Sequence, residues 1–191
     1  MKKIIIAILG TFLLTSCLYD AMYFLTDKDL EWMAPYEQGD TILFQSSGGI
    51  DTMTIDIFML YNDDNPWREN EGTSTFMGNS SFEYTIRHSE ELIEGQFLIL
   101  KEDSLKMNIA LRLRRRHLPL SDEKELQLCS QVIEGENYDD LIIVDDSNSE
   151  LYTKEPFNTE YFIWSKSKGL LKYKYLNGEV YTFYKKIPYK K

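Results

Sequence analysis

The chain has 191 residues, with 31 acidic and 21 basic side chains and a formal net charge of −10 at pH 7. Hydrophobic residues make up 43% and charged residues 27%, which is ordinary for one globular domain and excludes disorder over the whole length. The acidic balance excludes a binder of duplex nucleic acid, since such proteins need a basic face to displace counterions from the phosphates.

The first seventeen residues have the pattern of an export signal followed by a lipidation site. Lys2 and Lys3 precede an apolar run over 4–14, which is too short to span a bilayer core of ~30 Å and suits the apolar region of a signal peptide. Leu14-Thr15-Ser16-Cys17 follows and resembles the lipobox of bacterial lipoproteins. That resemblance implies cleavage before Cys17 and acylation of it, and two or three acyl chains suffice for stable anchoring.

These features divide the chain into a signal peptide at 1–16, the lipidated cysteine and a tether at 17–26, and a single antiparallel β domain at 27–191. Loss of Lys2 and Lys3 changes the side-chain charge from −10 to −12, so we expect anionic lipid to repel the domain and the acyl chains to hold it. Leu18, and not aspartate, follows the cysteine. The resemblance then implies the cell envelope, at the outer membrane and facing the periplasm.

The rest of the chain indicates strands, because its apolar residues recur mostly with period two. Thr26-x-x-Asp29 has the spacing of a capping box and predicts a short helical turn that ends before Pro35. Strands are expected at 41–44, 52–59, 82–87, 97–100, 105–114, 126–132, 141–144, 161–164, 170–176 and 180–184. The longest stretch without a strand pattern, 62–81, is expected to be a mobile loop.

Turn signals rather than helices separate the strands, which argues against a parallel sheet. The predicted fold is therefore all-β: an antiparallel β-sandwich or a strongly curved, partly closed meander sheet, with at most one or two short helical turns. Asn177-Gly178 predicts a two-residue type I′ turn that places Tyr175 opposite Val180. One face of this hairpin should be buried: Leu171, Tyr173, Tyr175, Val180 and Tyr184, with Lys172 and Lys174 on the other face.

Two segments also carry a family resemblance. Residues 29–40, followed by Phe44-x-Ser46 and Asp51-Thr52, resemble the opening of small lipoproteins of Bacteroidota-type bacteria. Residues 161–166, then 169–173 and Asn177-Gly178-Glu179, are similar to a closing hairpin of the same group. The resemblance implies an exported, β-rich lipoprotein, and it carries over no catalytic residue.

Two clusters are candidates for ligand binding. Arg112, Arg114, Arg115 and Arg116 form a basic run in an acidic chain and could bind a phosphate, an acidic glycan or a lipid headgroup; the alternative is the solvated end of a strand paired with the protein's own acids. Trp164, Tyr173 and Tyr181 belong to a dense C-terminal aromatic cluster and could stack on sugar rings; the alternative is cross-strand packing.

The main function hypothesis is a lipid-anchored cell-envelope protein, a non-enzymatic binding or assembly component whose partner is an envelope protein or a glycan. No cofactor and no metal are expected, because the sequence has neither paired Cys and His ligands nor a phosphate-binding loop. Two alternatives stay open. One is a carrier of lipophilic cargo in a cavity of the curved sheet. The other is a glycan-processing hydrolase with two carboxylates facing each other across ~5–9.5 Å.

The lipidation site is directly testable. Cells supplied with a radiolabelled fatty acid should label the protein, and Cys17→Ser should abolish the label, because the thioether sulfur is then missing. Cys129 should react as a free thiol in the labelled protein, since its one partner within the chain is acylated. A label that survives Cys17→Ser would contradict the anchor.

Overall fold

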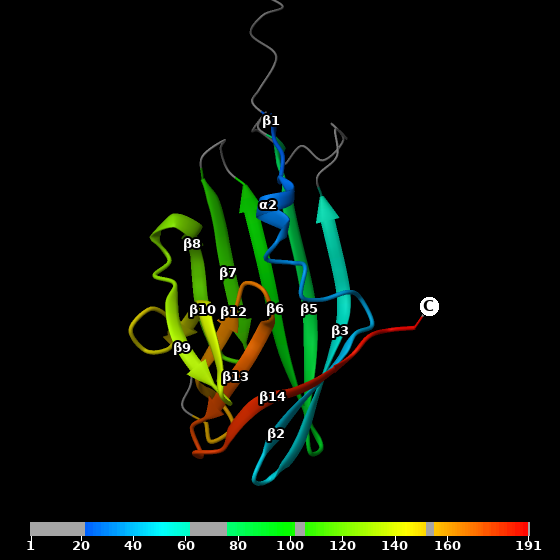
Figure 1. Cartoon of the computed structure of the whole chain (residues 1–191), viewed down its shortest axis with the longest axis vertical. Helices are drawn as coiled ribbons and strands as arrows, with labels where there is room; N and C mark the ends of the chain where they lie inside the picture. Colours follow the sequence, from blue (N-terminus) through cyan, green and yellow to red (C-terminus); the bar gives the residue numbers. More distant parts are fainter. Residues whose placement is uncertain (1–21, 62–75, 102–105, 152–154, 191) are drawn as a thin grey trace, which may run out of the picture.

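The computed structural model of the chain describes residues 22–61, 76–101, 106–151 and 155–190 (Figure 1). Its main feature is one antiparallel sheet with the strand order β11-β8-β7-β6-β5-β3-β2-β14-β13-β12-β10-β9. The predicted all-β, curved antiparallel fold is therefore confirmed. The strands are β2 (Thr41–Ser46), β3 (Gly49–Tyr61), β5 (Asn79–His88), β6 (Glu91–Lys101), β7 (Met107–Leu113), β8 (Arg116–Asp122), β9 (Cys129–Ile133), β10 (Glu136–Val144), β11 (Glu150–Leu151), β12 (Thr159–Ser165), β13 (Gly169–Tyr175) and β14 (Val180–Ile187).

The other elements are small. β1 (Met22–Tyr23) pairs in parallel with β4 (Phe76–Met77), α2 (Asp27–Leu30) is one helical turn, and η2 (Glu123–Glu125) is a 3-10 turn. The Thr26 and Asp29 side chains each bond the other's backbone N–H, so the predicted capping box is confirmed. Within the described residues, no helix has the length and apolar character that a membrane span requires.

Several expectations concern residues outside the described part. The signal peptide and Cys17 fall within 1–21, and most of the loop expected over 62–81 falls within 62–75. The end of that expected loop is corrected, because β4 covers 76–77 and β5 begins at Asn79. Within the expected tether at 17–26, Leu25 is only 4% exposed and belongs to the main core.

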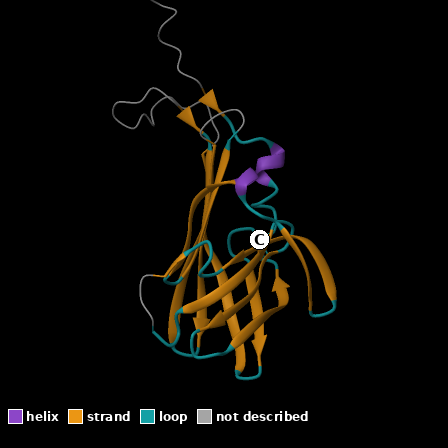
Figure 2. Ribbon diagram, turned by 90° about the vertical axis from the view of Figure 1, so that its left-hand side faces the viewer, coloured by secondary structure: helices purple, strands orange, loops and turns teal. Residues whose placement is uncertain are grey.

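The sheet curls until β8 stands opposite β12, but it does not close into a continuous ladder. The Arg116 Nε on β8 donates to the Thr159 carbonyl on β12 at 2.9 Å, and Thr159 Oγ1 donates to the Leu113 carbonyl at 3.4 Å. Figure 2 shows the strands wrapped around a common interior. Inward-facing side chains of distant strands therefore meet each other, and no second sheet is needed to bury them.

Aromatic rings fill this interior. Phe97 of β6 stacks on Phe82 of β5 and on Trp164 of β12, with ring centroids 5.4 and 5.1 Å apart. None of the three side chains has exposed surface. Each such pair contributes ~0.5–1.5 kcal/mol beyond the burial of its area. The inside of the curved sheet is thus a packed core.

Residues 27–36, which comprise α2 and the turns that follow it, cover the open part of the core. We call them the covering segment, and Figure 1 shows them crossing the long strands. Trp32 stacks on Phe97 with centroids 6.3 Å apart, and its Nε1 donates to Glu123 at 2.8 Å. Tyr36 meets the Trp164 ring edge-on at 5.9 Å, and its hydroxyl accepts the Leu170 N–H at 2.8 Å. The segment is therefore a structural part of the core.

A buried ion pair holds α2 in place. Lys101 Nζ on β6 lies 2.6 Å from the Asp29 carboxylate. Burial alone would raise the pKa of Asp29, but hydrogen bonds from Lys101 and Thr26 outweigh it and lower the pKa. Tyr36 in turn needs Gly169, because a Cβ there would stand 2.3 Å from the tyrosine ring.

A second, smaller apolar cluster lies on the opposite face of β12 and its neighbours. Phe162 and Trp164 face the core, so Ile163 between them faces outward. We call this second cluster the outer cluster: Ile133, Leu141, Ile163 and Leu171, with Cys129, Tyr138, Ile143, Tyr161 and Phe183 at its margin.

The closing hairpin is shifted by one residue from the predicted register. Lys174 lies opposite Val180, and Tyr175 bonds across the loop to Glu179. Gly178 donates to the Tyr175 carbonyl and has φ +96, whereas the preceding asparagine does not adopt positive φ. This is a three-residue loop with a bulge, so the predicted type I′ turn is wrong.

The shift changes the faces of β14. On β13 one position also differs: Leu171, predicted to share the buried face of Tyr173 and Tyr175, lies in the outer cluster on the opposite face, because the β12–β13 register shifts between Ile163 and Trp164. Tyr173 and Tyr175 are buried and the two lysines between and before them are partly exposed, as predicted. On β14, however, Tyr181 takes the inward place that was expected for Val180, and Tyr184 is 57% exposed.

β8 is a strand that the sequence pattern does not predict. The expected strand at 105–114 ends at Leu113, and the chain folds back through Arg114 and Arg115. Arg114 has φ +53, a conformation usually signalled by Gly or Asn. The arginine run therefore forms a hairpin turn.

The role of the covering segment predicts a specific stability change. Tyr36→Phe should lower the free energy of unfolding by ~1–3 kcal/mol, because the buried Leu170 N–H loses its acceptor. Tyr184→Phe, at an exposed ring, should change it by less than ~0.5 kcal/mol. Urea unfolding followed by tryptophan fluorescence measures both, and equal values for the two variants would contradict the structural role.

Candidate functional site

The structure separates the arginine cluster into exposed and buried members. Arg112 and Arg115 are exposed, and with Arg114 they line a shallow pocket of about 310 Å³. Acidic side chains stand in the same place: Arg114 lies 2.9 Å from Glu91 and 3.9 Å from Glu155. The charge of Arg114 is therefore neutralised within the chain.

Arg116 has no exposed surface and is bound on three sides. Its guanidinium donates to the Thr159 carbonyl at 2.9 Å, to Ser149 Oγ at 2.7 Å and to Asp146 at 2.6 Å. All of these partners belong to the chain itself, so this guanidinium is not free for an external anion. Strand alternation in β8 could have indicated this burial, because Arg116 lies two positions before the buried Leu118 and so shares its inward face.

The three candidate stacking residues have no ring face open to a sugar. Trp164 and Tyr173 are fully buried, and Tyr181 is almost so. Tyr173 and Tyr181 stack on each other with centroids 5.3 Å apart across the closing hairpin. These rings are part of the packed core, and the glycan-stacking hypothesis finds no exposed ring among them.

A buried polar network, which the sequence patterns did not predict, links β3, β5 and β13. Asp51 on β3 accepts from Tyr173 at 2.7 Å and from Tyr175 at 3.3 Å, and its other oxygen lies 2.9 Å from His88 Nδ1. His88 Nε2 faces Glu179 Oε2 at 3.7 Å. No local sequence pattern signals the network, because its members are 37 to 124 positions from Asp51.

The network braces the fold rather than opening a reaction centre. Burial raises the pKa of Asp51, and the hydrogen bonds from Tyr173 and His88 counteract that rise only in part. Both oxygens of Asp51 are engaged within the core. Phe157 and Tyr181 pack on the His88 ring, so the imidazole has little access to a substrate.

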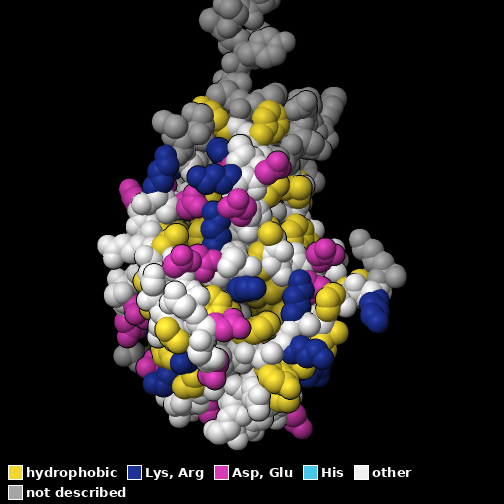
Figure 3. All heavy atoms as spheres, in the orientation of Figure 1, with side chains coloured by type: hydrophobic (Ala, Val, Ile, Leu, Met, Phe, Trp, Pro, Cys, Tyr) yellow, Lys and Arg dark blue, Asp and Glu magenta, His cyan; other side chains and the backbone are white. Residues whose placement is uncertain are grey.

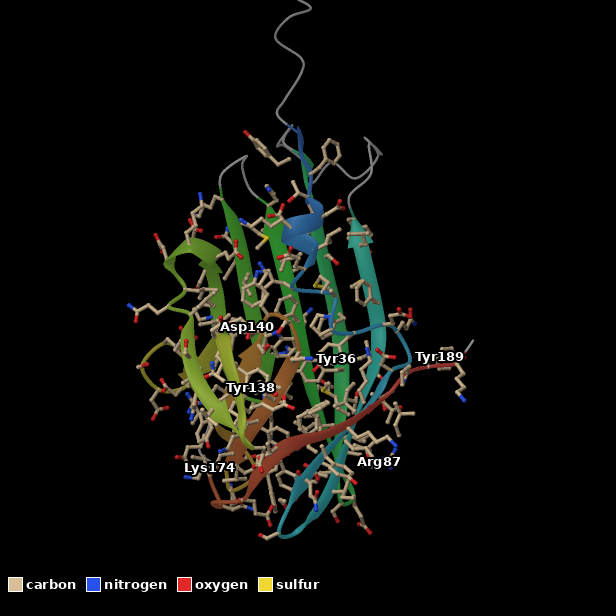
Figure 4. All side chains as sticks on the ribbon, in the orientation of Figure 1. Tyr36, Arg87, Tyr138, Asp140, Lys174 and Tyr189 are labelled. Atoms are coloured by element: carbon tan, nitrogen blue, oxygen red, sulfur yellow. The ribbon has the colours of Figure 1, made fainter. Side chains whose placement is uncertain are left out.

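An open groove of about 440 Å³ lies beside the outer cluster. Figure 3 shows apolar side chains near the middle of this face with charged ones around them, and Figure 4 labels two lining residues, Tyr138 and Tyr36. We call it the outer groove, lined by Pro35, Tyr36, Ile133, Glu134, Glu136, Tyr138, Ser167, Lys168, Leu171, Thr182, Phe183, Tyr184 and Lys186.

The groove combines aromatic surface with charges of both signs. Burial and the hydrogen bond to Glu136 raise the pKa of Tyr138 to about 12, so this hydroxyl stays protonated and donates at 2.8 Å. Lys186 is engaged by Asp40 at 2.6 Å and by the Pro35 carbonyl at 2.8 Å. Lys168 has no such ion pair among the described residues. The arrangement can hold a ligand.

A second groove of about 530 Å³ adjoins the outer cluster at Tyr161 and Ile143. Its acids are engaged: Asp146 by Arg116, and Glu160 by Lys174 at 2.8 Å. Hydrogen bonds from Ser147 lower the pKa of Asp145. Across the ranges that the structure describes, no group of three or more His, Cys, Asp or Glu could hold a metal ion.

A substitution of a solvated arginine would leave the free energy of unfolding nearly unchanged, but Arg116 is buried and its substitution should not. Arg116→Gln should lower the free energy of unfolding by ~2–3 kcal/mol, since the buried Thr159 carbonyl and the loop at 146–149 lose their donors. The matched control Arg115→Gln should stay within ~0.5 kcal/mol. Urea unfolding measures both, and a small effect at both positions would show that the guanidinium is dispensable.

Comparisons of the chain with protein-family models, with curated proteins and with solved structures found no match. No relative therefore lends this chain catalytic or binding residues. The candidate sites rest on geometry: an internal network around Asp51 and His88 that is closed to ligands, and an outer groove that is open to them.

Proposed function

We propose that this chain is a lipid-anchored, non-enzymatic binding component of the bacterial cell envelope, which holds its partner in the outer groove. The anchor is Cys17, and the location is the outer membrane, with the domain facing the periplasm. The observation that carries the binding role is the groove itself, a recess of about 440 Å³ with aromatic walls beside an apolar cluster on the sheet's outer face.

The filled interior argues against a carrier of lipophilic cargo. Such a carrier needs an apolar cavity inside the curved sheet, but Trp32, Phe82 and Trp164 occupy that space without exposed surface. Opening it would separate stacked rings and expose the core. Binding at the outer face requires no such change.

The state of the carboxylates in the second groove argues against a hydrolase there. A glycosidase needs one carboxylic acid with a raised pKa facing a second carboxylate across the sugar. Asp145 has a lowered pKa, and Asp146 and Glu160 form ion pairs with Arg116 and Lys174. Asp51 does have a raised pKa, but it lies inside the core.

Site-specific photocrosslinking in cells tests the groove. A benzophenone side chain placed at Tyr184, which is exposed on the groove wall, should give a discrete adduct with an envelope component. The same group at Leu92, equally exposed on β6 but outside the groove, is the matched control and should give none. The readout is a mobility shift on an immunoblot after irradiation.

Two further changes sharpen this experiment. Tyr138→Ala should remove most of the Tyr184-site adduct, because it takes away a groove wall, and Cys17→Ser should reduce it by releasing the chain from the membrane. Equal adducts from the Tyr184 and Leu92 sites, or an adduct that Tyr138→Ala leaves intact, would contradict a groove-based function.

A further inference from the structure

β9 forms one edge of the sheet, and its outer side is paired with no strand among the described residues. It is the last strand in the sheet order, and β10 is its one paired neighbour in the described part of the chain. An edge strand presents unpaired N–H and C=O groups, which can pair with an incoming extended chain. The question is which groups are free and what chain they fit.

The hairpin register identifies the free groups. Glu134 and Gly135 both have positive φ, at +50 and +85, which defines a two-residue type I′ turn between Ile133 and Glu136. The residues that flank such a turn form a hydrogen-bonded pair, and the ladder is regular from Ile133 to Gln131. Opposite Ser130 the register shifts between Tyr138 and Leu141 of β10, but β9 is a continuous strand over Cys129–Ile133, so its own N–H and C=O groups keep alternating in direction. The backbone groups of Val132 and Ser130 therefore point away from β10, toward the open edge.

The two edges of the sheet differ in how they are protected. β8, near the other edge, is partly covered by β11 at Arg116 and His117, and Pro119 follows within the strand. β9 contains neither Pro nor Lys, the residues that commonly block an edge. Instead it exposes apolar surface, with Val132 62% exposed and Leu128, just before the strand, 46% exposed.

The segment that contains this edge is strongly acidic, while lysines from elsewhere in the chain line the grooves beside it: Lys172 with Gln131, and Lys168 and Lys186 with Ile133. Residues 122–150, which include β9 and β10, contain ten acidic residues and one lysine, a net charge of −9 out of −10 for the chain. Among the described residues, only Glu123 and Asp146 of the ten form ion pairs. Figure 3 shows acidic side chains on the left of the molecule, where Figure 1 places β9 and β10.

We propose that β9 binds an extended, basic segment of a partner polypeptide, which adds to the sheet as a further strand. This inference rests on the proposed binding function and names the class of partner. The free groups of Ser130 and Val132 supply the hydrogen bonds, and the acidic surroundings select basic side chains. A second copy of this chain fits poorly, because pairing β9 with β9 would bring two segments of charge −9 together.

The face pattern of β9 sets the pattern of the added strand. Cys129 and Ile133 belong to the outer cluster, so alternate positions of the partner strand lie beside apolar surface. The intervening positions are free to carry lysine or arginine. A suitable probe is therefore a fluorescein-labelled octapeptide of alternating lysine and valine, with an analogue N-methylated at every second amide as its control.

Fluorescence anisotropy with the full chain in detergent measures the binding. The octapeptide should bind, and its N-methylated analogue should bind at least ~tenfold more weakly, because it has equal charge but cannot complete the ladder. Amide hydrogen exchange gives the register: the Ser130 and Val132 amides should gain protection when the peptide is added, while the Gln131 and Ile133 amides, already paired with β10, should change little.

Two sets of variants locate the site. Val132→Pro removes an outward N–H and should weaken octapeptide binding ~tenfold, whereas Val132→Thr, which keeps it, should stay within ~twofold. Glu134→Gln with Glu136→Gln should weaken binding and flatten its salt dependence. The control variant Glu37→Gln with Glu90→Gln changes two exposed residues far from β9 in sequence. It should leave the affinity for the octapeptide and the salt dependence of binding unchanged.

Three results would overturn the proposal. Equal binding of the octapeptide and its N-methylated analogue would show charge attraction without strand addition. Unchanged affinity in Val132→Pro, with hydrogen exchange protection elsewhere, would place the peptide at another site. A dimer in sedimentation velocity that Val132→Pro dissociates would identify a second copy as the occupant. A Tyr184-site adduct together with any of these results would leave the groove-based function standing, so the two failures are distinguishable.

Discussion

A single sheet that curls on itself leaves part of its inner face open, and this fold depends on one short segment to cover that gap. Trp32 and Tyr36 do so by packing on Phe97 and Trp164. The covering segment has little regular structure of its own, since α2 is one turn long. Its position therefore depends on tertiary contacts: the Lys101–Asp29 ion pair, the bond from Trp32 to Glu123 and the bond from Leu170 to Tyr36. Without these contacts the stacked aromatic core would face water.

This way of completing the core limits where function can lie. The inward side chains are committed to packing, and the polar groups among them are committed to each other, as in the contacts of Asp51 and Arg116. What remains is the outside of the sheet. There the outer cluster buries part of its surface and leaves two grooves and the edge strand β9 at its margin. A ligand can bind to these features without any rearrangement of the core.

Period-two patterns were sufficient to predict the fold class, most strands and the inward faces of Tyr173 and Tyr175, because these depend on local alternation. Turns were harder. Asn177-Gly178 allows both a two-residue and a three-residue loop, and the packing of Tyr181 against Tyr173 selects the longer one. In the type I′ turn between β9 and β10 a positive φ falls on Glu134, and in the β7–β8 turn it falls on Arg114. Neither residue type signals a turn in the sequence. The candidate sites were mostly beyond prediction, because the outer groove and the Asp51 network join residues far apart in the chain.

The covering segment also sets the mechanical behaviour of the domain. The described chain enters through β1 and α2 and reaches Trp32 within ten residues of Met22. A pulling force applied from the N-terminal side would act first on the parallel β1–β4 pair and the Lys101–Asp29 contact, and then directly on the core rings. The long antiparallel strands would carry load only after that segment had been withdrawn. Tension on a tether at this end would therefore expose the aromatic core as soon as the covering segment is pulled away. Loss of this segment is then the first step of mechanical unfolding.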